Sequence, residues 1–423
     1  GFRDFLPELM RVRSFVLRTL RAVFESFGFE PLETPSLEYS TTLLGKYGAE
    51  ADKLVYTLQD RGKRDVGLIY DLTVPIARVL ATSQNEIKLP FKRYQIQRVW
   101  RAEKPQKGRY REILQCDVDT FGVASPLADA EIIAVIYTAL KKLGFEKFTI
   151  NVNSRKTLFN LLKSGGLEIK EKQLSILRTI DKQDKKSKEA IEEELRNKGL
   201  EKDAAALVLE TIKKATPDAE LEQVIDLAEH LGVGPEYIKF APTLVRGLDY
   251  YTGPIFETVL EEPKIGSITG GGRYDNLIEQ LGGPDTPAVG TSFGLDRICD
   301  AITELGLLKE RKKPTTQVLV TIWPEEKRRL KSATTKTVGG GNSALQCALS
   351  LTNRLRAQNI DCEMYLNPSA KLDKQLKYAD RKGIPFVVIA GPEEIKAGKL
   401  TLKNMATGEQ EQLTPEELVD KLK

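Results

Sequence analysis

Histidine is almost absent from this chain, which has only His230 among its 423 residues. A single imidazole excludes His-rich metal sites and argues against histidine-based catalysis. Cysteine is also scarce: Cys116, Cys299, Cys347 and Cys362 include no CxxC pair, so neither a disulfide framework nor a zinc knuckle is indicated. We expect buried free thiols and no protein metal ligands. Any chemistry must then come from Arg, Asp, Glu, Gln and Tyr.

Long apolar runs are missing as well. No stretch of about 18 apolar residues could span a bilayer, and the N-terminus lacks the apolar segment of a secretory signal. We therefore predict a cytoplasmic protein without membrane association. The net charge of +4 is mild, so composition permits nucleic-acid binding without arguing for it. The length predicts two or three domains.

The stretch 93–122 is typical of two strands joined by a polar loop. Polar side chains at alternate positions share a face of each predicted strand. They are Gln97, Arg101 and Glu103 before the loop, and Arg111, Gln115 and Asp119 after it. The loop carries Lys104, Lys107 and Arg109 on a turn built by Pro105 and Gly108, which suits contact with phosphate. A solvated hairpin with charged ends is the alternative.

The N-terminal part predicts a helix, an edge strand and a polar junction. Apolar residues recur at helical spacing from Pro7 to Gly28. Pro31 then interrupts an extended segment, which favours an edge strand and a dimer contact. Asp71 and Thr73 fall where a strand meets a helix, so they can point into a cleft. Thr73 could equally do no more than cap that helix.

Composition divides the chain into three parts. Residues 1–153 and 239–310 are rich in strand-like patterns, whereas 154–238 is rich in Lys, Glu, Leu and Ala at helical spacing. We interpret the latter as an all-helical insertion whose charges are mostly solvated. In residues 315–423, strands alternate with helices, which predicts a small α/β domain with a partly parallel sheet.

Three further segments carry candidate ligand-binding groups. Arg246 stands beside a glycine and two tyrosines, as an anion site would require or as a structural pair with Asp249 would. Three consecutive glycines then permit close backbone approach to a ligand before a helix expected at Asp275. Arg297 lies in the first turn of a predicted helix, against the helix dipole. A ligand explains that conflict, and so does a salt bridge with Asp296 or Asp300.

The last domain presents a predicted basic stripe on one helix. Lys374, Lys377 and Arg381 share the outer side without a matching acidic stripe. A solvated helix face is one explanation, and a surface that follows phosphates is the other. The basic, glycine-rich stretch 328–343 is assigned no fixed structure.

Four segments together resemble the histidyl-tRNA synthetase family of class II aminoacyl-tRNA synthetases. GFEPLETPSLEY resembles the first class II motif, WRAEKPQKGRYREI the second and GTSFGLDRI the third, while RGLDYYTG resembles a signature of the histidyl enzymes. The resemblance covers nearly the whole chain. It implies an α+β class II catalytic domain with a six-stranded antiparallel sheet and flanking helices, a helical insertion, and a C-terminal α/β anticodon-binding domain. It also implies a homodimer through the N-terminal helix and the motif 1 strand.

The resemblance further implies a two-step ligation of histidine to the 3′ end of tRNA(His), with ATP as a substrate and Mg²⁺ accompanying it. Arg101 and Arg246, the catalytic pair, would hold the histidine carboxylate and the α-phosphate. For ATP, the implied contacts are Glu103 on the adenine amino group, Tyr110 stacked near the adenine, and Arg109 and Arg297 on the outer phosphates. For histidine, they are Asp71, Thr73 and Gln115 on the α-amino group, and Asp119 and Tyr251 on the imidazole with Tyr274 close by. We expect tRNA contacts from Lys104, Gln106, Lys107, Lys374, Lys377 and Arg381.

Two non-catalytic classes remain as alternatives. A regulatory paralogue that acts on histidine biosynthesis would lack the C-terminal domain and lose parts of the RGLDYY signature, and this chain keeps both. A synthetase-like domain that senses uncharged tRNA usually accompanies a kinase, and no kinase-like segment is present here.

Overall fold

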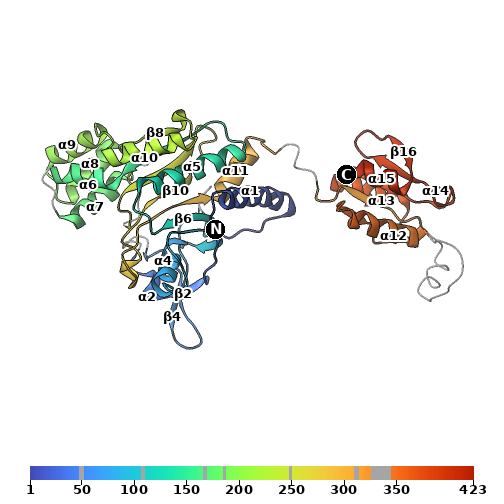
Figure 1. The fold of residues 1–423 in the computed structure, drawn as a ribbon, viewed down its shortest axis with the longest axis horizontal. Coiled ribbons are helices and arrows are strands. Elements are labelled where there is room, and N and C mark those ends of the chain that lie inside the picture. Colours follow the sequence, from blue (N-terminus) through green and yellow to red (C-terminus); the bar gives the residue numbers. More distant parts are fainter. Residues whose placement is uncertain are drawn as a thin grey trace. The chain divides into compact units, whose positions relative to one another are not determined.

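The computed structural model describes residues 1–46, 52–105, 110–164, 169–183, 187–246, 250–308, 314–324 and 344–423. The chain forms two compact units, Gly1–Leu308 and Lys309–Lys423, drawn in blue to orange and in orange to red in Figure 1. Within the described ranges, none of the helices has both the length and the apolar content needed to cross a membrane.

The first unit is built on an eight-stranded sheet in the order β1-β5-β6-β11-β10-β9-β7-β8. The strands are β1 Glu30–Pro31, β5 Phe91–Trp100, β6 Glu112–Phe121, β11 Ala288–Gly294, β10 Ser267–Arg273, β9 Pro254–Leu260, β7 Phe148–Ser154 and β8 Ile238–Phe240. The six central strands are antiparallel, and short parallel strands β1 and β8 form the two edges. The edge position predicted from Pro31 is confirmed by the strand order. Proline suits an edge because it has no N–H group to donate to a neighbouring strand.

The register of the β5–β6 hairpin brings the predicted polar faces together. Gln97 pairs with Gln115 and Arg93 pairs with Asp119, so alternate residues of both strands point to the same side of the sheet. β5 ends at Trp100, and Arg101 and Glu103 follow it in the connecting segment. The hairpin is therefore part of the central sheet and not a solvated projection.

Helices cover one face of this sheet and a smaller sheet covers the other (Figure 1). Val16, Leu20 and Phe24 of α1 belong to the larger core, which has contributions from the helices α1 Pro7–Ser26, α5 Pro126–Lys142, α10 Ala219–His230 and α11 Leu295–Glu304. α1 starts with proline, as predicted, and Gly28 follows it with φ +79°. The opposite face carries α2 Ser40–Leu43, α4 Thr73–Thr82, β2 Leu37–Tyr39, β3 Thr57–Gln59 and β4 Asp65–Leu68.

Four helices at one end of the unit have a core of their own. Leu158, Ile176, Leu195 and Leu209 represent this core, which forms between α6 Arg155–Ser164, α7 Lys170–Ile180, α8 Lys188–Asn197 and α9 Lys202–Lys213. α10 instead packs on α5 and belongs to the core of the large sheet. It ends at His230, which is exposed. A short 3₁₀ helix, Pro235–Tyr237, leads to β8. The limits 154–238 proposed for the helical insertion stay a prediction.

The helix predicted to begin at Asp275, after the triple glycine, does not form, so that prediction is wrong. Gly270, Gly271 and Gly272 form the interior of β10, and a turn with the 3₁₀ helix Glu279–Leu281 replaces the helix expected at Asp275. A Cβ on Gly271 would lie 2.0 Å from the carbonyl oxygen of Gly290 in the neighbouring strand. The glycines are needed because the backbones of β10 and β11 approach so closely.

The second unit contains a five-stranded sheet in the order β13-β12-β14-β15-β16. The strands are β13 Cys362–Met364, β12 Val318–Val320, β14 Phe386–Ile389, β15 Leu400–Asn404 and β16 Gln410–Leu413, with the helices α12 Ala344–Ala357, α13 Leu372–Lys382, α14 Pro392–Ala397 and α15 Pro415–Leu422. β13, β12 and β14 are parallel, whereas β15 and β16 are antiparallel. The predicted partly parallel α/β domain is confirmed.

Candidate active site

A cavity of about 260 Å³ lies on the large sheet of the first unit. Its walls come from the segment between β5 and β6, from β10 and β11, and from the first turn of α11. Among the residues predicted from sequence, the cavity is lined by Arg101, Glu103, Tyr110, Gln115, Arg246 and Arg297. Segments far apart in the chain therefore place three guanidinium groups around one space, as binding of a polyphosphate requires.

Arg246 is held in this wall by an acidic neighbour and by an unusual backbone conformation. Its φ is +61°, which a non-glycine residue seldom adopts. Its Nη1 donates to Oε1 of Glu257 at 2.8 Å, and Ser267 donates to the same oxygen. Burial lowers the pKa of Arg246, but Tyr251 and Glu257 together raise it by more. The pKa is therefore above its ordinary value and the guanidinium stays charged. The alternative pairing with Asp249 involves a residue outside the described ranges, and Glu257 is the acidic partner in the structure.

A glycine makes room for this arginine. A Cβ on Gly270 would lie 2.4 Å from Nη2 of Arg246. Any side chain at this position of β10 would therefore push the guanidinium out of its place over the sheet.

The two other cavity arginines bond to backbone carbonyls. Nε of Arg101 donates to the carbonyl of Tyr70 at 3.1 Å, and its guanidinium lies 4.5 Å from the centre of the Tyr70 ring. Nη1 of Arg297 donates to the carbonyl of Ser267 at 2.6 Å. These bonds fix the position of each charge and leave it intact, so both groups can still meet an anion.

Two arginines near the N-terminus contact residues that line the cavity, and neither was predicted as a site residue from the sequence. Nη2 of Arg3 donates to Oδ1 of Asp296 at 2.8 Å, and Arg13 donates to the same oxygen. The Arg3 guanidinium also lies 3.2 Å from the centre of the Tyr110 ring. Asp296, the residue before Arg297, is therefore paired with one arginine of the N-terminal segment and one of α1. No local pattern could have predicted this pairing.

A second polar group lies buried beside the cavity and contains the other predicted histidine contacts. Oδ2 of Asp119 lies 2.8 Å from Nη2 of Arg93, and the Tyr274 hydroxyl donates to Oδ1 of the same carboxylate. Burial raises the pKa of Asp119, and Arg93 opposes that rise. Tyr250 lies between the Tyr251 and Tyr274 rings, with centroids at 4.9 and 5.9 Å.

Asp71 belongs to the same group and caps α4. Its Oδ1 accepts from the backbone N–H groups of Thr73 and Val74, each at 3.1 Å, and the Tyr250 hydroxyl donates to Oδ2 at 3.5 Å. The structure thus differs from the prediction that Thr73 caps the helix, because α4 begins at Thr73 and the capping oxygen belongs to Asp71. The Thr73 side chain is half-buried at this junction.

Comparisons with known proteins identify the family. The model described as histidyl-tRNA synthetase matches residues 1–298, and the model described as anticodon binding domain matches residues 333–423. The first match covers well over half of the chain. This chain belongs to the histidyl-tRNA synthetase family.

Full-length relatives agree with this assignment. The histidine–tRNA ligase of Cytophaga hutchinsonii is 39% identical, with 100% of this chain and 98% of that protein covered. That of Rhodopirellula baltica is 40% identical, covering 97% of this chain and 93% of that protein. A crystal structure of histidyl-tRNA synthetase from Nostoc sp. has a TM-score of 0.81 at 28% identity and covers 100% of this chain and 97% of that one. The predicted family, fold class and enzyme class are confirmed, and the regulatory alternative is not favoured.

The polar face of β5 and β6 contains more residues than those predicted from the sequence. Arg93, Gln95 and Asp117 stand at the same alternate positions as Gln97, Gln115 and Asp119, and all are buried. The period-two pattern itself was the signal that could have identified them. Burial raises the pKa of Asp117 to about 7, although Arg93 lowers it.

The residues proposed to contact tRNA are only partly described. Gln106 and Lys107 lie outside the described residues, while Lys104 is exposed. Arg109, predicted to bind the outer phosphates of ATP, and the stretch 328–343 also lie outside the described residues. Lys374, Lys377 and Arg381 are exposed on α13. Nζ of Lys377 lies 2.8 Å from Oδ2 of Asp373, so one cation of the stripe has an acidic partner on the same helix.

The described part of the chain contains no cluster of side chains that commonly bind metal ions. No group of three or more His, Cys, Asp or Glu residues there could hold a metal ion. Carboxyl groups at the cavity are Glu103 and Asp296, and Oδ2 of Asp296 is buried without a hydrogen-bond partner among the described residues.

Proposed function

We propose that this chain activates histidine with ATP to give histidyl-adenylate and pyrophosphate, and then transfers the histidyl group to the 3′ end of tRNA(His) in the cytoplasm. The observation that carries the proposal is the cavity with Arg101, Arg246 and Arg297 in its walls, next to the buried group around Asp71 and Asp119. A cationic site for phosphates thus adjoins a polar site for a small zwitterion.

The first step requires charge stabilisation and no protein nucleophile. The histidine carboxylate attacks the α-phosphorus of ATP, and negative charge builds up on the equatorial oxygens of the pentacoordinate transition state. Arg101 and Arg246 hold the carboxylate and the α-phosphate. Because both guanidiniums are already fixed by Tyr70 and Glu257, they need not reorganise as this charge develops.

Selection of histidine rests on the buried group. Asp119 and Tyr251 bond the two polar edges of the imidazole with Tyr274 beside them, while Asp71, Thr73 and Gln115 receive the α-amino group. A substitute without these polar atoms would leave buried groups unpaired, which is a strong basis for rejection.

The ATP contacts extend along the cavity. Glu103 accepts from the adenine amino group, Tyr110 stacks near the ring, and Arg297 binds the outer phosphates together with Arg109. Mg²⁺ would accompany ATP and supply positive charge that neutralises the phosphates. With Glu103 at the adenine, Asp296 is the cavity carboxyl group that would lie near the ion. Removal of Mg²⁺ with a chelator should abolish exchange, and undiminished exchange would contradict this part.

The tRNA contacts involve both units. Lys104, Gln106 and Lys107 meet the acceptor end, and Lys374, Lys377 and Arg381 contact the tRNA from the second unit, which matches an anticodon-binding domain. Lysine and arginine are the usual groups that bind nucleic-acid phosphates.

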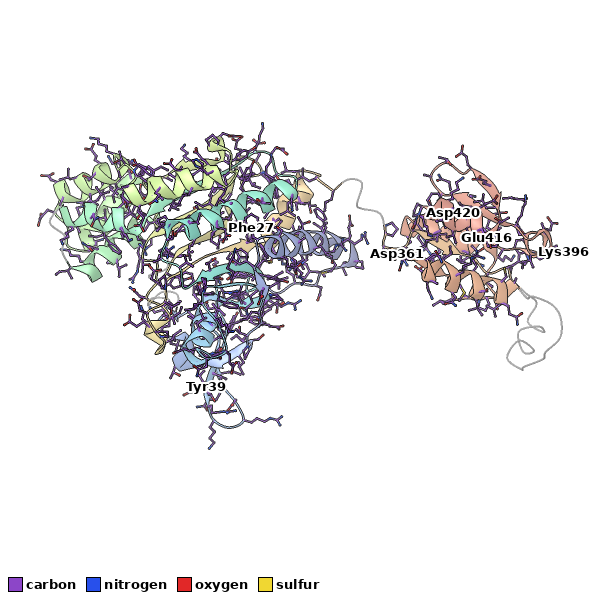
Figure 2. All side chains as sticks on the ribbon, viewed as in Figure 1. Phe27, Tyr39, Asp361, Lys396, Glu416 and Asp420 are labelled. Atoms are coloured by element: carbon purple, nitrogen blue, oxygen red, sulfur yellow. The ribbon has the colours of Figure 1, made fainter. Side chains whose placement is uncertain are left out.

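We also infer a homodimer through α1 and β2. Leu6 is 70% exposed just before α1, and Leu9 and Met10 are exposed on its first turns. Leu37 and Tyr39 are exposed on β2, and Tyr39 is labelled in Figure 2. Large apolar side chains exposed on both elements support an interface there. Sedimentation at micromolar concentration should show twice the chain mass, and a monomer would contradict the inference.

Amino-acid-dependent pyrophosphate exchange tests the proposed function. The purified chain should exchange labelled pyrophosphate into ATP with histidine and not with the other nineteen amino acids. Exchange with a different amino acid, or with none, would overturn the assignment. Transfer to tRNA(His) and not to another tRNA then tests the second step.

A further inference from the structure

Three buried carboxyl groups, those of Asp71, Asp117 and Asp119, interact with one another beside the cavity. Asp119 is paired with Arg93 at 2.8 Å, and Asp71 accepts two backbone N–H bonds at the start of α4. Asp117, only 3% exposed, has neither of these arrangements. Ionised carboxylates that lie close together in a site shielded from water repel one another, which is costly.

The neighbours of Asp117 indicate that it holds a proton. The strand register pairs Asp117 with Gln95 of β5, and both Oδ1 of Asp117 and Oε1 of Gln95 are buried without a hydrogen-bond partner among the described residues. Two acceptors on paired positions can bond only if one of them carries a proton. A protonated Asp117 supplies that donor.

Asp117 is also connected to the proposed histidine site. β11 places Ser292 opposite it, and Ser292 hydrogen-bonds to the Asp117 carboxyl. The Ser292 hydroxyl in turn accepts from Nε2 of Gln115 at 2.8 Å, and both Gln115 and Ser292 line the cavity. A change in the charge of Asp117 therefore acts on a side chain at the cavity surface.

The charged and titratable groups around Asp117 come from four parts of the fold. They are Arg93 on β5, Cys116 and Asp119 on β6, Asp71 before α4, and Tyr274 after β10. Burial is the largest cause of the raised pKa of Asp117, about 7, with Asp119 and Asp71 adding to it and Arg93 opposing it. A cation that entered beside Asp71 would lower this pKa.

We propose that Asp117 is a positioning residue that carries a proton while the site is empty and releases it to solvent when the α-ammonium group of histidine binds beside Asp71. This inference rests on the proposed function, because it takes histidine as the ligand. The ammonium brings a further positive charge to these carboxyl groups, which favours the ionised form of Asp117. The ionised Asp117 then orients Ser292 and, through it, Gln115 toward the bound amino acid.

Calorimetric titration of the full chain with L-histidine, without ATP, measures the proton directly. Titrations at pH 7 in two buffers with different ionisation enthalpies should show roughly half a proton released per histidine bound, because a group with a pKa of about 7 is half protonated there. Asp117→Asn removes this release. Asp420→Asn, an acid-to-amide change at the exposed residue labelled in Figure 2, keeps it.

The pH dependence of the histidine KM in pyrophosphate exchange is the second readout. In the wild type the KM should fall about tenfold, relative to Asp117→Asn, between pH 6 and pH 8 as Asp117 ionises. The ratio of the two KM values cancels the titration of free histidine. A merely structural role would change both values equally at every pH.

Two outcomes would overturn the inference. One is a wild-type titration in which the heat does not depend on the buffer beyond the contribution of free histidine, a result that needs no variant to fold. The other is an equal proton count in the wild type and Asp117→Asn. Absence of histidine-dependent exchange in the wild type would instead count against the proposed function.

Discussion

Arg246 shows how one residue combines strain, pairing and function. It adopts a left-handed backbone conformation, it is fixed by Glu257, and a glycine in β10 leaves space for it. Strained backbone of this kind is kept where surrounding structure determines it, commonly at functional sites. RGLDYYTG could be recognised in the sequence, but its acidic partner could not, because Glu257 stands on a separate strand.

We predict that Arg246→Ala reduces histidine-dependent pyrophosphate exchange by more than about a hundredfold. A charge-assisted contact contributes about 1.5 to 3 kcal/mol, and the transition-state charge adds to it. Circular dichroism should show an intact fold, and Arg98→Ala, a change at an exposed arginine of β5, should leave exchange unchanged. A near wild-type rate in Arg246→Ala would contradict the assigned role.

At the scale of elements, the site depends on two glycine-containing strands beside one polar hairpin. β5 and β6 supply side chains at alternate positions, and β10 and β11 leave space above the sheet. The alternation could be predicted because it is a local property with a period of two. The place of the glycines could not, because a run of glycine is compatible with a loop, and only the pairing with β9 and β11 makes it a strand.

Gly290→Ala tests whether the site needs a glycine at this position of β11. A Cβ on Gly290 would lie 1.9 Å from Oδ1 of Asp119 and 2.6 Å from the carbonyl oxygen of Val118, so the carboxylate beside Tyr274 and the neighbouring backbone of β6 must shift. We predict at least a tenfold rise in the KM for histidine with a smaller change in the KM for ATP. Gly62→Ala, in an exposed turn where the added Cβ meets only the flexible side chains of Asp60 and Arg64, is the matched control. Equal changes for both substrates would count against a specific effect on Asp119.

At the scale of the whole molecule, the chain separates two tasks between two units. The first contains the cavity and the buried polar group, whereas the second matches an anticodon-binding domain. The exposed cations of α13 include one, Lys377, that is already paired with Asp373. Exposed ion pairs of this kind contribute little to stability, so the helix can exchange Asp373 for a phosphate at small cost.

Replacement of Lys374, Lys377 and Arg381 together by glutamine should raise the KM for tRNA and flatten its dependence on salt, because fewer counterions are released on binding. Pyrophosphate exchange should not change, since that step needs no tRNA. The same replacement at Lys396, Lys399 and Lys423, exposed lysines outside α13, is the control. If the α13 variant aminoacylates tRNA as the wild type does, the helix is only a solvated face.

The sequence by itself determined the family, the alternation of the hairpin, the edge strand and the class of the second unit, because short motifs and periodicities carry this information locally. Only the tertiary structure decided which groups meet. Arg3 and Arg13 bond to Asp296 across 293 and 283 positions, and Asp117 becomes a buried acid only when β5, β11 and Asp71 enclose it. Burial and pairing set the charge of a side chain, and both depend on residues that are distant in sequence.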